Sequence, residues 1–185
     1  MEEPMNESIR SYFKNLEATD KQLQYEAFQK IINATSEQVD WAYEVWDELV
    51  SWLGDADNHK RARGAQILAG LAKSDQEKRI LTDFVSLWNV TKDEKFVTAR
   101  HALQAIWKVG LAGDQQKMLV FHHLVNRFHT CKDEKNATLI RYDVLQSLRN
   151  LYDETNDEKL KQQALTLIEA ETDPKYQKKY LKLWK

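Results

Sequence analysis

Four side chains between positions 122 and 131 are of types that can bind metal ions. They are His122, His123, His129 and Cys131. A tetrahedral zinc site needs ligand atoms within about 4 Å of one another. On a helix, His122 and His129 would lie two turns apart, about 10 Å along the axis. We therefore expect structural or surface histidines, with no metal site and no cofactor.

An acidic stripe is the second candidate for a site. The helix expected over 36–53 carries carboxylates at spacings that place them on one face. These are Glu37, Asp40, Glu44 and Asp47, with Glu48 beside them. Like charges on adjacent turns cost roughly a few tenths of a kcal/mol each. The stripe therefore predicts either a surface that binds a basic partner or a plain solvated face.

The same stretch is rich in aromatic side chains, namely Trp41, Tyr43, Trp46 and Trp52. Trp and Tyr are enriched where one side of the ring is apolar and the other is wet, which includes protein interfaces. In a thin stack of helices they can also be core. Exposed members of this set are the expected anchors for a partner.

A basic helix is expected after Asp173, with Pro174 at its first position. Its lysines (Lys175, Lys178, Lys179 and Lys182) form one stripe, and Tyr176, Tyr180 and Trp184 form another. Basic amphipathic helices can lie on membranes or bind nucleic acid. With few strong aliphatic residues, this one is expected instead to cap a stack of helices and bury its aromatic stripe.

The elements that would position these residues follow a period of about forty residues. Capping boxes at Thr35–Gln38, Ser74–Glu77 and Thr155–Glu158, with Asp114 between them, predict helix starts. A second series begins near Thr19, Asp57, Thr91 and Asp133. Since no proline lies between Met5 and Asp173, long helices are allowed throughout. The expected hairpins are 19–32 with 35–54, 58–73 with 75–90, 93–110 with 114–130, and 134–153 with 156–170, flanked by helices over 6–16 and 173–184.

Similarity between the units supports this division. Lys92-Asp93-Glu94-Lys95 recurs as Lys132-Asp133-Glu134-Lys135, and an arginine follows early in the first helix of three units, at Arg61, Arg100 and Arg141. With its period, its two helices per unit and this acid-then-arginine pattern, the chain resembles the HEAT repeat family. The stretch 98–106 is closest to the family's pattern. Because the first helices lack proline, an armadillo or other hairpin subtype remains open.

The resemblance implies an all-α fold, a right-handed α-α superhelix of about four HEAT-like hairpins with a flanking helix at each end. It is expected to form one domain over 1–185, with capping helices at 1–18 and 173–185 and repeats over 19–170. In the family, second helices line the concave surface where partners dock. The expected function is thus a non-catalytic scaffold for a protein or peptide partner, possibly basic. The expected partner-binding residues are Trp41, Glu44, Asp47, Glu48, His122, His123 and Arg127.

An alternative is a nucleic-acid function. The segment 46–50 faintly resembles the Trp and Asp pair of bacterial DNA-alkylation-repair glycosylases, which are built from similar helical repeats. Here the residue one turn beyond Trp46 is Val50, so the acid is misplaced. A basic track for phosphates would require several side chains on one face: Arg61, Arg63, Arg100, Lys108, Arg127 and Arg141. Nucleic acid is therefore the less favoured partner.

Charge and composition limit which partners and which cellular compartment are expected. Residues 1–60 carry a net charge of −8 and residues 61–185 carry +6, which together give the chain's −2. Such polarity can steer a charged partner. The single cysteine suits a reducing compartment, and no apolar run approaches the roughly 20 residues of a membrane span. With no apolar signal segment at the N-terminus, we expect a cytoplasmic protein that does not engage membranes.

Overall fold

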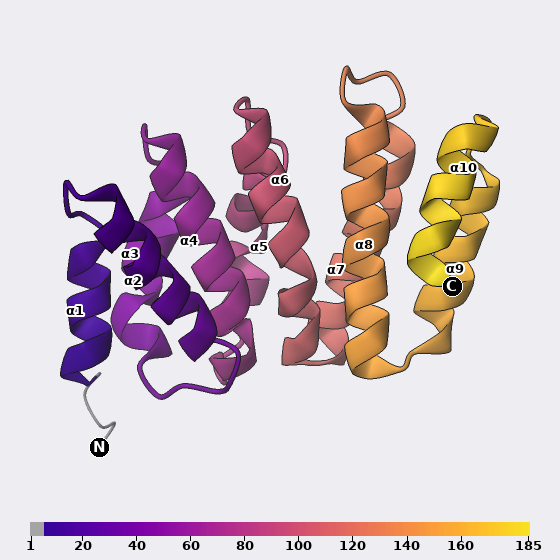
Figure 1. Ribbon diagram of the computed structural model, residues 1–185. Coiled ribbons are helices and arrows are strands. Elements are labelled where there is room, and N and C mark those ends of the chain that lie inside the picture. Colours follow the sequence, from indigo (N-terminus) through magenta and orange to yellow (C-terminus); the bar gives the residue numbers. More distant parts are fainter. Residues whose placement is uncertain (1–5) are drawn as a thin grey trace. The chain divides into compact units, whose positions relative to one another are not determined.

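The computed structural model describes residues 6–185, and within that range the chain is entirely helical, with ten α-helices and no strand. Figure 1 shows their order. The α-helices are α1 (Glu7–Asn15), α2 (Lys21–Ala34), α3 (Ala42–Trp52), α4 (Asn58–Leu71), α5 (Ile80–Val90), α6 (Phe96–Ala105), α7 (Asp114–Thr130), α8 (Ala137–Thr155), α9 (Glu158–Glu169) and α10 (Pro174–Leu181). The 3-10 helices are η1 (Ala72–Ser74), η2 (Ile106–Ala112) and η3 (Lys182–Trp184). The prediction of an all-α protein is confirmed.

The chain divides into two compact units, and the boundary between Ala102 and Leu103 falls inside α6. In the first unit, α2 packs on α1 and α4, and α3 packs on α4 and α5. The expected hairpin of 19–32 with 35–54 is therefore not the main pairing, because residues 35–41 form a connection rather than a helical turn. The core of this unit includes Ile31, Trp46, Leu49, Ile67, Leu68, Leu71, Ile80 and Phe84.

In the second unit, η2 packs on α7 and α8, α8 packs on α9, and α10 packs on α8 and α9. The contacts of α8 with α9, and of α10 with both, confirm the expected hairpin of 134–153 with 156–170 and the flanking helix. Of the expected helix over 93–110, η2 is the part that packs on α7. Tyr180 of α10 is fully buried, and its hydroxyl donates to the Thr138 carbonyl at 2.9 Å. Trp184 is also buried and Tyr176 is half-buried, so two of the three rings expected to be buried lie in the core. No helix within residues 6–185 is long and apolar enough to cross a membrane.

The helix starts lie elsewhere than the capping boxes predicted. The hydroxyl of Thr35 donates to the Ile32 carbonyl at 2.8 Å, and that of Thr155 donates to the Leu151 carbonyl at 2.7 Å. Both threonines therefore close the end of a helix, because a hydroxyl can bond back to the preceding turn as well as cap the next one. The side-chain caps of α2 and α9 are the carboxylates of Asp20 and Asp157. The starts expected at Asp57 and Asp173 are confirmed, since these carboxylates cap α4 and α10.

The prediction for Ser74 was also wrong. Its hydroxyl accepts from the backbone N–H of Val39 at 2.9 Å, and α5 begins at Ile80 rather than at 75. Asp75 takes over the capping role, since its carboxylate accepts from the N–H groups of Arg79 (3.0 Å) and Ile80 (2.7 Å).

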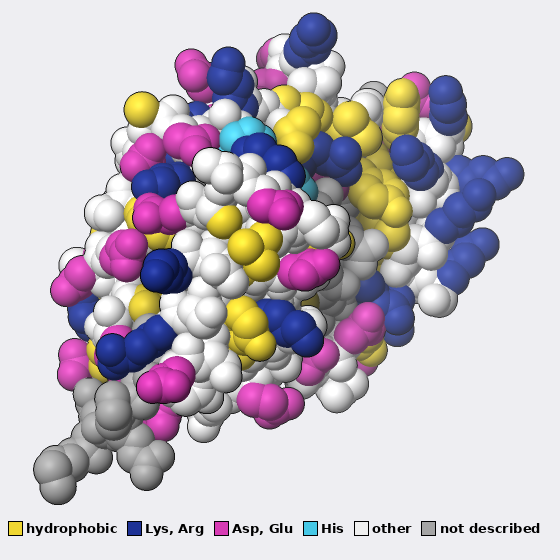
Figure 2. Space-filling model, turned by 60° about the vertical axis from the view of Figure 1, so that its left-hand side comes forward, with side chains coloured by type: hydrophobic (Ala, Val, Ile, Leu, Met, Phe, Trp, Pro, Cys, Tyr) yellow, Lys and Arg dark blue, Asp and Glu magenta, His cyan; other side chains and the backbone are white. Residues whose placement is uncertain are grey.

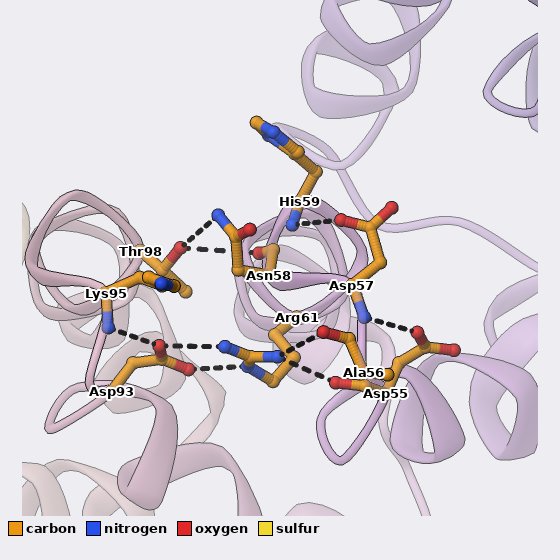
Figure 3. A network of polar contacts seen from close by, with 9 residues as sticks. All are labelled: Asp55, Ala56, Asp57, Asn58, His59, Arg61, Asp93, Lys95 and Thr98. Carbon is orange, nitrogen blue, oxygen red and sulfur yellow. Dashed lines mark hydrogen bonds and ion pairs between the residues drawn. The ribbon is translucent and has the colours of Figure 1, made fainter.

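The acid and arginine residues of this pattern link α4 to the start of α6 (Figure 3). The Arg61 guanidinium donates to both carboxylate oxygens of Asp93, at 2.6 and 3.0 Å, and to the Asp55 carbonyl at 2.8 Å. Asp93 also accepts from the N–H of Lys95 at 2.8 Å. The link therefore joins α4, the loop before it and the start of α6.

The second unit repeats this arrangement. Arg141 donates to the Glu171 carboxylate at 2.7 Å and to the Phe128 carbonyl at 3.1 Å. Glu171 accepts in turn from the N–H of Asp173 at 3.0 Å. The same three-way link therefore occurs in both units, which supports the internal repeat.

Gly70 provides a test of how closely α2 and α4 approach. A Cβ atom at this buried position would lie 2.4 Å from Oγ1 and 2.9 Å from Cβ of Thr35. We expect Gly70→Ala to lower the free energy of unfolding by about 1–3 kcal/mol, because the side chain of Thr35 is itself buried and cannot swing away. Gly54→Ala is the matched control, since nothing lies within 4 Å of its added Cβ. Urea denaturation measures both; equal stabilities would contradict this packing.

Asp93 provides a test of the Arg61 link through pH. The Arg61 guanidinium holds the pKa of the Asp93 carboxyl below its usual range. A carboxyl whose folded-state pKa is lowered contributes stability above its unfolded pKa, near 3.9, and this contribution is lost as the pH falls through the folded pKa. We expect Asp93→Asn to be less stable at neutral pH and to lose less further stability on acidification below about pH 4. Urea midpoints measured against pH, with the exposed Asp40→Asn as control, test this.

Candidate functional site

The acidic residues predicted to bind a partner lie partly on α3. This helix buries Val45, Trp46 and Leu49 in the core, so residues on the opposite side face solvent. Glu44, Asp47 and Glu48 are on that side and form what we call the acidic face. Asp47 has 84% of its side chain exposed. Glu37 and Asp40 are also exposed, but they precede the helix, so the predicted five-residue stripe is shorter than expected.

Two arginines already contact this face. Arg10 of α1 lies 3.2 Å from the carboxylate of Glu44, whose side chain is 32% exposed. Arg79 donates to Asp47, and its guanidinium lies 5.5 Å from the ring centre of Tyr43 and 5.7 Å from that of Trp46. Ion pairs this exposed contribute little to stability and exchange readily with other cations. The face is thus suited to contact with further cationic side chains.

Contacts between α3 and the segment 75–83 hold the acidic face in place. The Tyr43 hydroxyl donates to Asp75 at 2.7 Å and accepts from the N–H of Glu77 at 2.7 Å. The indole N–H of Trp46 donates to Asp83 at 2.8 Å. Burial, together with the hydrogen bond to Asp75, raises the pKa of Tyr43 to about 12. The phenol therefore stays protonated and keeps donating across the ordinary pH range.

The tryptophans of this region belong to the core. Trp41, Trp46 and Trp52 are 5%, 0% and 6% exposed, and Trp41 packs edge-on against Phe13 at 5.9 Å. The expectation that exposed members of this set anchor a partner is therefore not met by these three rings in this structure. Tyr43 is the half-buried exception, and its hydroxyl is already bonded.

The remaining expected site residues lie on α7, in the second unit. His122 is exposed beside the Phe121 ring, and His123 is half-buried with Nδ1 2.8 Å from the Leu119 carbonyl. Arg127 is buried and donates to Glu134 through both terminal nitrogens. Its role is therefore to hold the loop after α7. Among residues 6–185 no group of His, Cys, Asp or Glu side chains is arranged to hold a metal ion.

The arginines of the proposed basic track are largely committed elsewhere. Arg61 and Arg141 form the links to Asp93 and Glu171, with 14% and 13% of their side chains exposed. Arg63 donates to the Leu16 carbonyl and to Gln24. Full burial also keeps the Trp46 ring from contact with a nucleobase in this structure. The glycosylase-like alternative stays a prediction.

Sequence reasoning missed Arg79, Asp75 and Asp83. All three lie more than thirty positions from their partners on α3, and the chain around 75–79 is not helical. Neither helical periodicity nor local spacing carries that information.

No protein-family model, no curated protein and no solved structure matches this chain. What the fold and contacts define is an all-helical protein built from packed helical hairpins, and no family is identified.

Tyr43→Phe tests the contact beneath the acidic face. The substitution removes one donor to Asp75 and the acceptor of the Glu77 N–H, so we expect a loss of about 1 kcal/mol in the free energy of unfolding. Tyr25→Phe is the matched control, because that ring is 60% exposed. Chemical denaturation of both variants measures the free energy of unfolding. If the control loses as much stability as Tyr43→Phe, the hydrogen bonds of the Tyr43 hydroxyl to Asp75 and Glu77 do not stabilise the segment 75–79.

Proposed function

We propose that this protein is a non-catalytic HEAT-like repeat scaffold that binds a basic protein or peptide through the acidic face of α3. The observation that carries the proposal is the exposure of Glu44, Asp47 and Glu48 on adjacent turns of one helix. Lys or Arg side chains of a partner would replace Arg10 and Arg79 at these carboxylates. A cationic partner would also relieve the repulsion between neighbouring carboxylates, which makes the free energy of binding more favourable.

The proposal includes a right-handed superhelix of HEAT-like repeats. Its support is the recurrence of the arginine–carboxylate link, in which Arg61 reaches Asp93 and Arg141 reaches Glu171 over 32 and 30 positions. Stacked repeats bury one another's apolar faces and expose an extended binding surface. A cytoplasmic setting is part of the proposal, supported by a single, buried thiol at Cys131.

Contacts to a partner in the second unit would come from His122 and His123. His122 is exposed on α7, and an imidazole can donate or accept according to its protonation. Trp41 and Arg127 are left out of the contact set, because both are buried.

The test reverses charge on the acidic face. We expect Glu44→Lys/Asp47→Lys to weaken binding of a labelled hexa-arginine peptide at least about tenfold, because two attractive contacts become repulsive. Glu154→Lys/Glu169→Lys is the matched control: it makes the same change in net charge at exposed positions of the second unit. Fluorescence anisotropy gives the affinities, and circular dichroism confirms that helicity is retained.

Capture from native host lysate, with and without nuclease, extends this test to a natural partner. The proposal would be supported by a protein that co-purifies in stoichiometric amount after nuclease treatment. This protein should bind the control variant but not the acidic-face variant. Equal peptide affinity in the two double variants, or recovery that requires intact nucleic acid, would contradict it.

A further inference from the structure

A cavity of about 450 Å³ opens in the first unit between the first turns of α2 and α4. Its volume falls in the range of about 300–1,000 Å³ typical of small-molecule sites. The end of α1 contributes Leu16 and the end of α3 contributes Trp52, so four helices shape it. None of the residues of the acidic face lines it.

One part of the lining is aromatic. Tyr25 and Phe28 of α2 and Trp52 of α3 all border the cavity. Tyr25 is 60% exposed, which leaves much of its ring surface open to contact. Flat rings favour planar ligands, because offset or edge-on packing adds about 0.5–1.5 kcal/mol beyond the burial of area.

Another part of the lining is cationic. Arg63 is held by two neutral acceptors, the Leu16 carbonyl at 3.3 Å and Gln24 Oε1 at 3.1 Å, so these contacts fix its guanidinium without neutralising it. Lys60 Nζ lies 5.8 Å from the ring centre of Trp52 and 3.4 Å from Glu17. An aromatic surface and fixed cations therefore meet in one cavity.

The charged side chains that line the cavity indicate the charge of a ligand that would fit there. Lys21, Lys60 and Arg63 are opposed by the carboxylates of Glu17 and Asp57. Asp57 is turned toward the start of α4, where it accepts from the N–H of His59 at 2.8 Å. Glu17 has 65% of its side chain exposed, so its contact with Lys60 is weak and easily displaced. One positive charge is left over, which a monoanion balances.

We propose that this cavity binds a planar aromatic carboxylate, with the ring against Tyr25 and Phe28 and the carboxylate on Lys60 and Arg63. The carboxylate displaces Glu17 from Lys60. Two sources supply this chemistry: a free small aromatic acid, or the C-terminal residue of a peptide that ends in an aromatic side chain. The site is independent of the acidic face.

The experiment uses the full chain and three probes. Indole-3-acetate represents the free acid, N-acetyl-Gly-Gly-Trp represents the peptide terminus, and indole-3-acetamide is the neutral control. Saturation-transfer NMR and chemical-shift titration measure binding, with a dissociation constant of roughly millimolar or below expected for ligands of this size. At least one carboxylate should bind fivefold or more tightly than the amide. Preference for the acetate or for the peptide identifies the source.

Two variants locate the site. Tyr25→Ala and Lys60→Gln should each weaken binding of the preferred probe by roughly threefold to tenfold. Leu23→Ala and Lys30→Gln are the matched controls, because both residues are exposed on α2 and neither lines the cavity. Equal binding of acid and amide, no saturable binding of either acid, or the same affinity in site and control variants with folding intact would overturn the proposal.

Discussion

The structure depends on an arginine that ties three segments together. Arg61 in the first unit and Arg141 in the second each bind a carboxylate at the start of a later helix and a carbonyl that precedes their own helix. A buried ion pair stabilises a fold only where its remaining hydrogen-bonding groups are also satisfied. Here both acids also accept a backbone N–H, from Lys95 and from Asp173. The link therefore fixes the spacing between neighbouring helices as well as their charge balance.

This link also decides which charges are left for binding. Arg61 and Arg141, two of the three arginines that recur early in the first helices, are engaged in this link, so their charges are already paired inside the fold. The carboxylates of α3 have no such role. Glu44 and Asp47 meet Arg10 and Arg79 at the surface, where water and salt screen the pairs. Burial therefore distinguishes the ion pairs that hold the fold together from the exposed pairs that a partner's charged side chains could replace.

Helical periodicity was enough to predict the all-α fold and most helices, because apolar side chains must recur on the buried face. The capping boxes, in contrast, misplaced two helix starts, because a threonine hydroxyl can bond in two directions: Thr35 and Thr155 donate to the preceding turn and do not cap the next helix. The exposure of Glu44 and Asp47 followed from spacing on one helix. Their contacts with distant arginines did not, because these depend on tertiary packing.

Burial of the tryptophans determines how the acidic face would recognise a partner. With Trp41 and Trp46 in the core, the face offers carboxylates and little apolar area. Binding there would rest on charge, which favours rapid and salt-sensitive association over tight burial. The cavity between α2 and α4 has the opposite character, because Tyr25 and Phe28 supply apolar area next to Lys60 and Arg63. One unit thus presents two chemically distinct surfaces: an exposed row of carboxylates on α3, and a cavity that combines aromatic rings with cationic side chains.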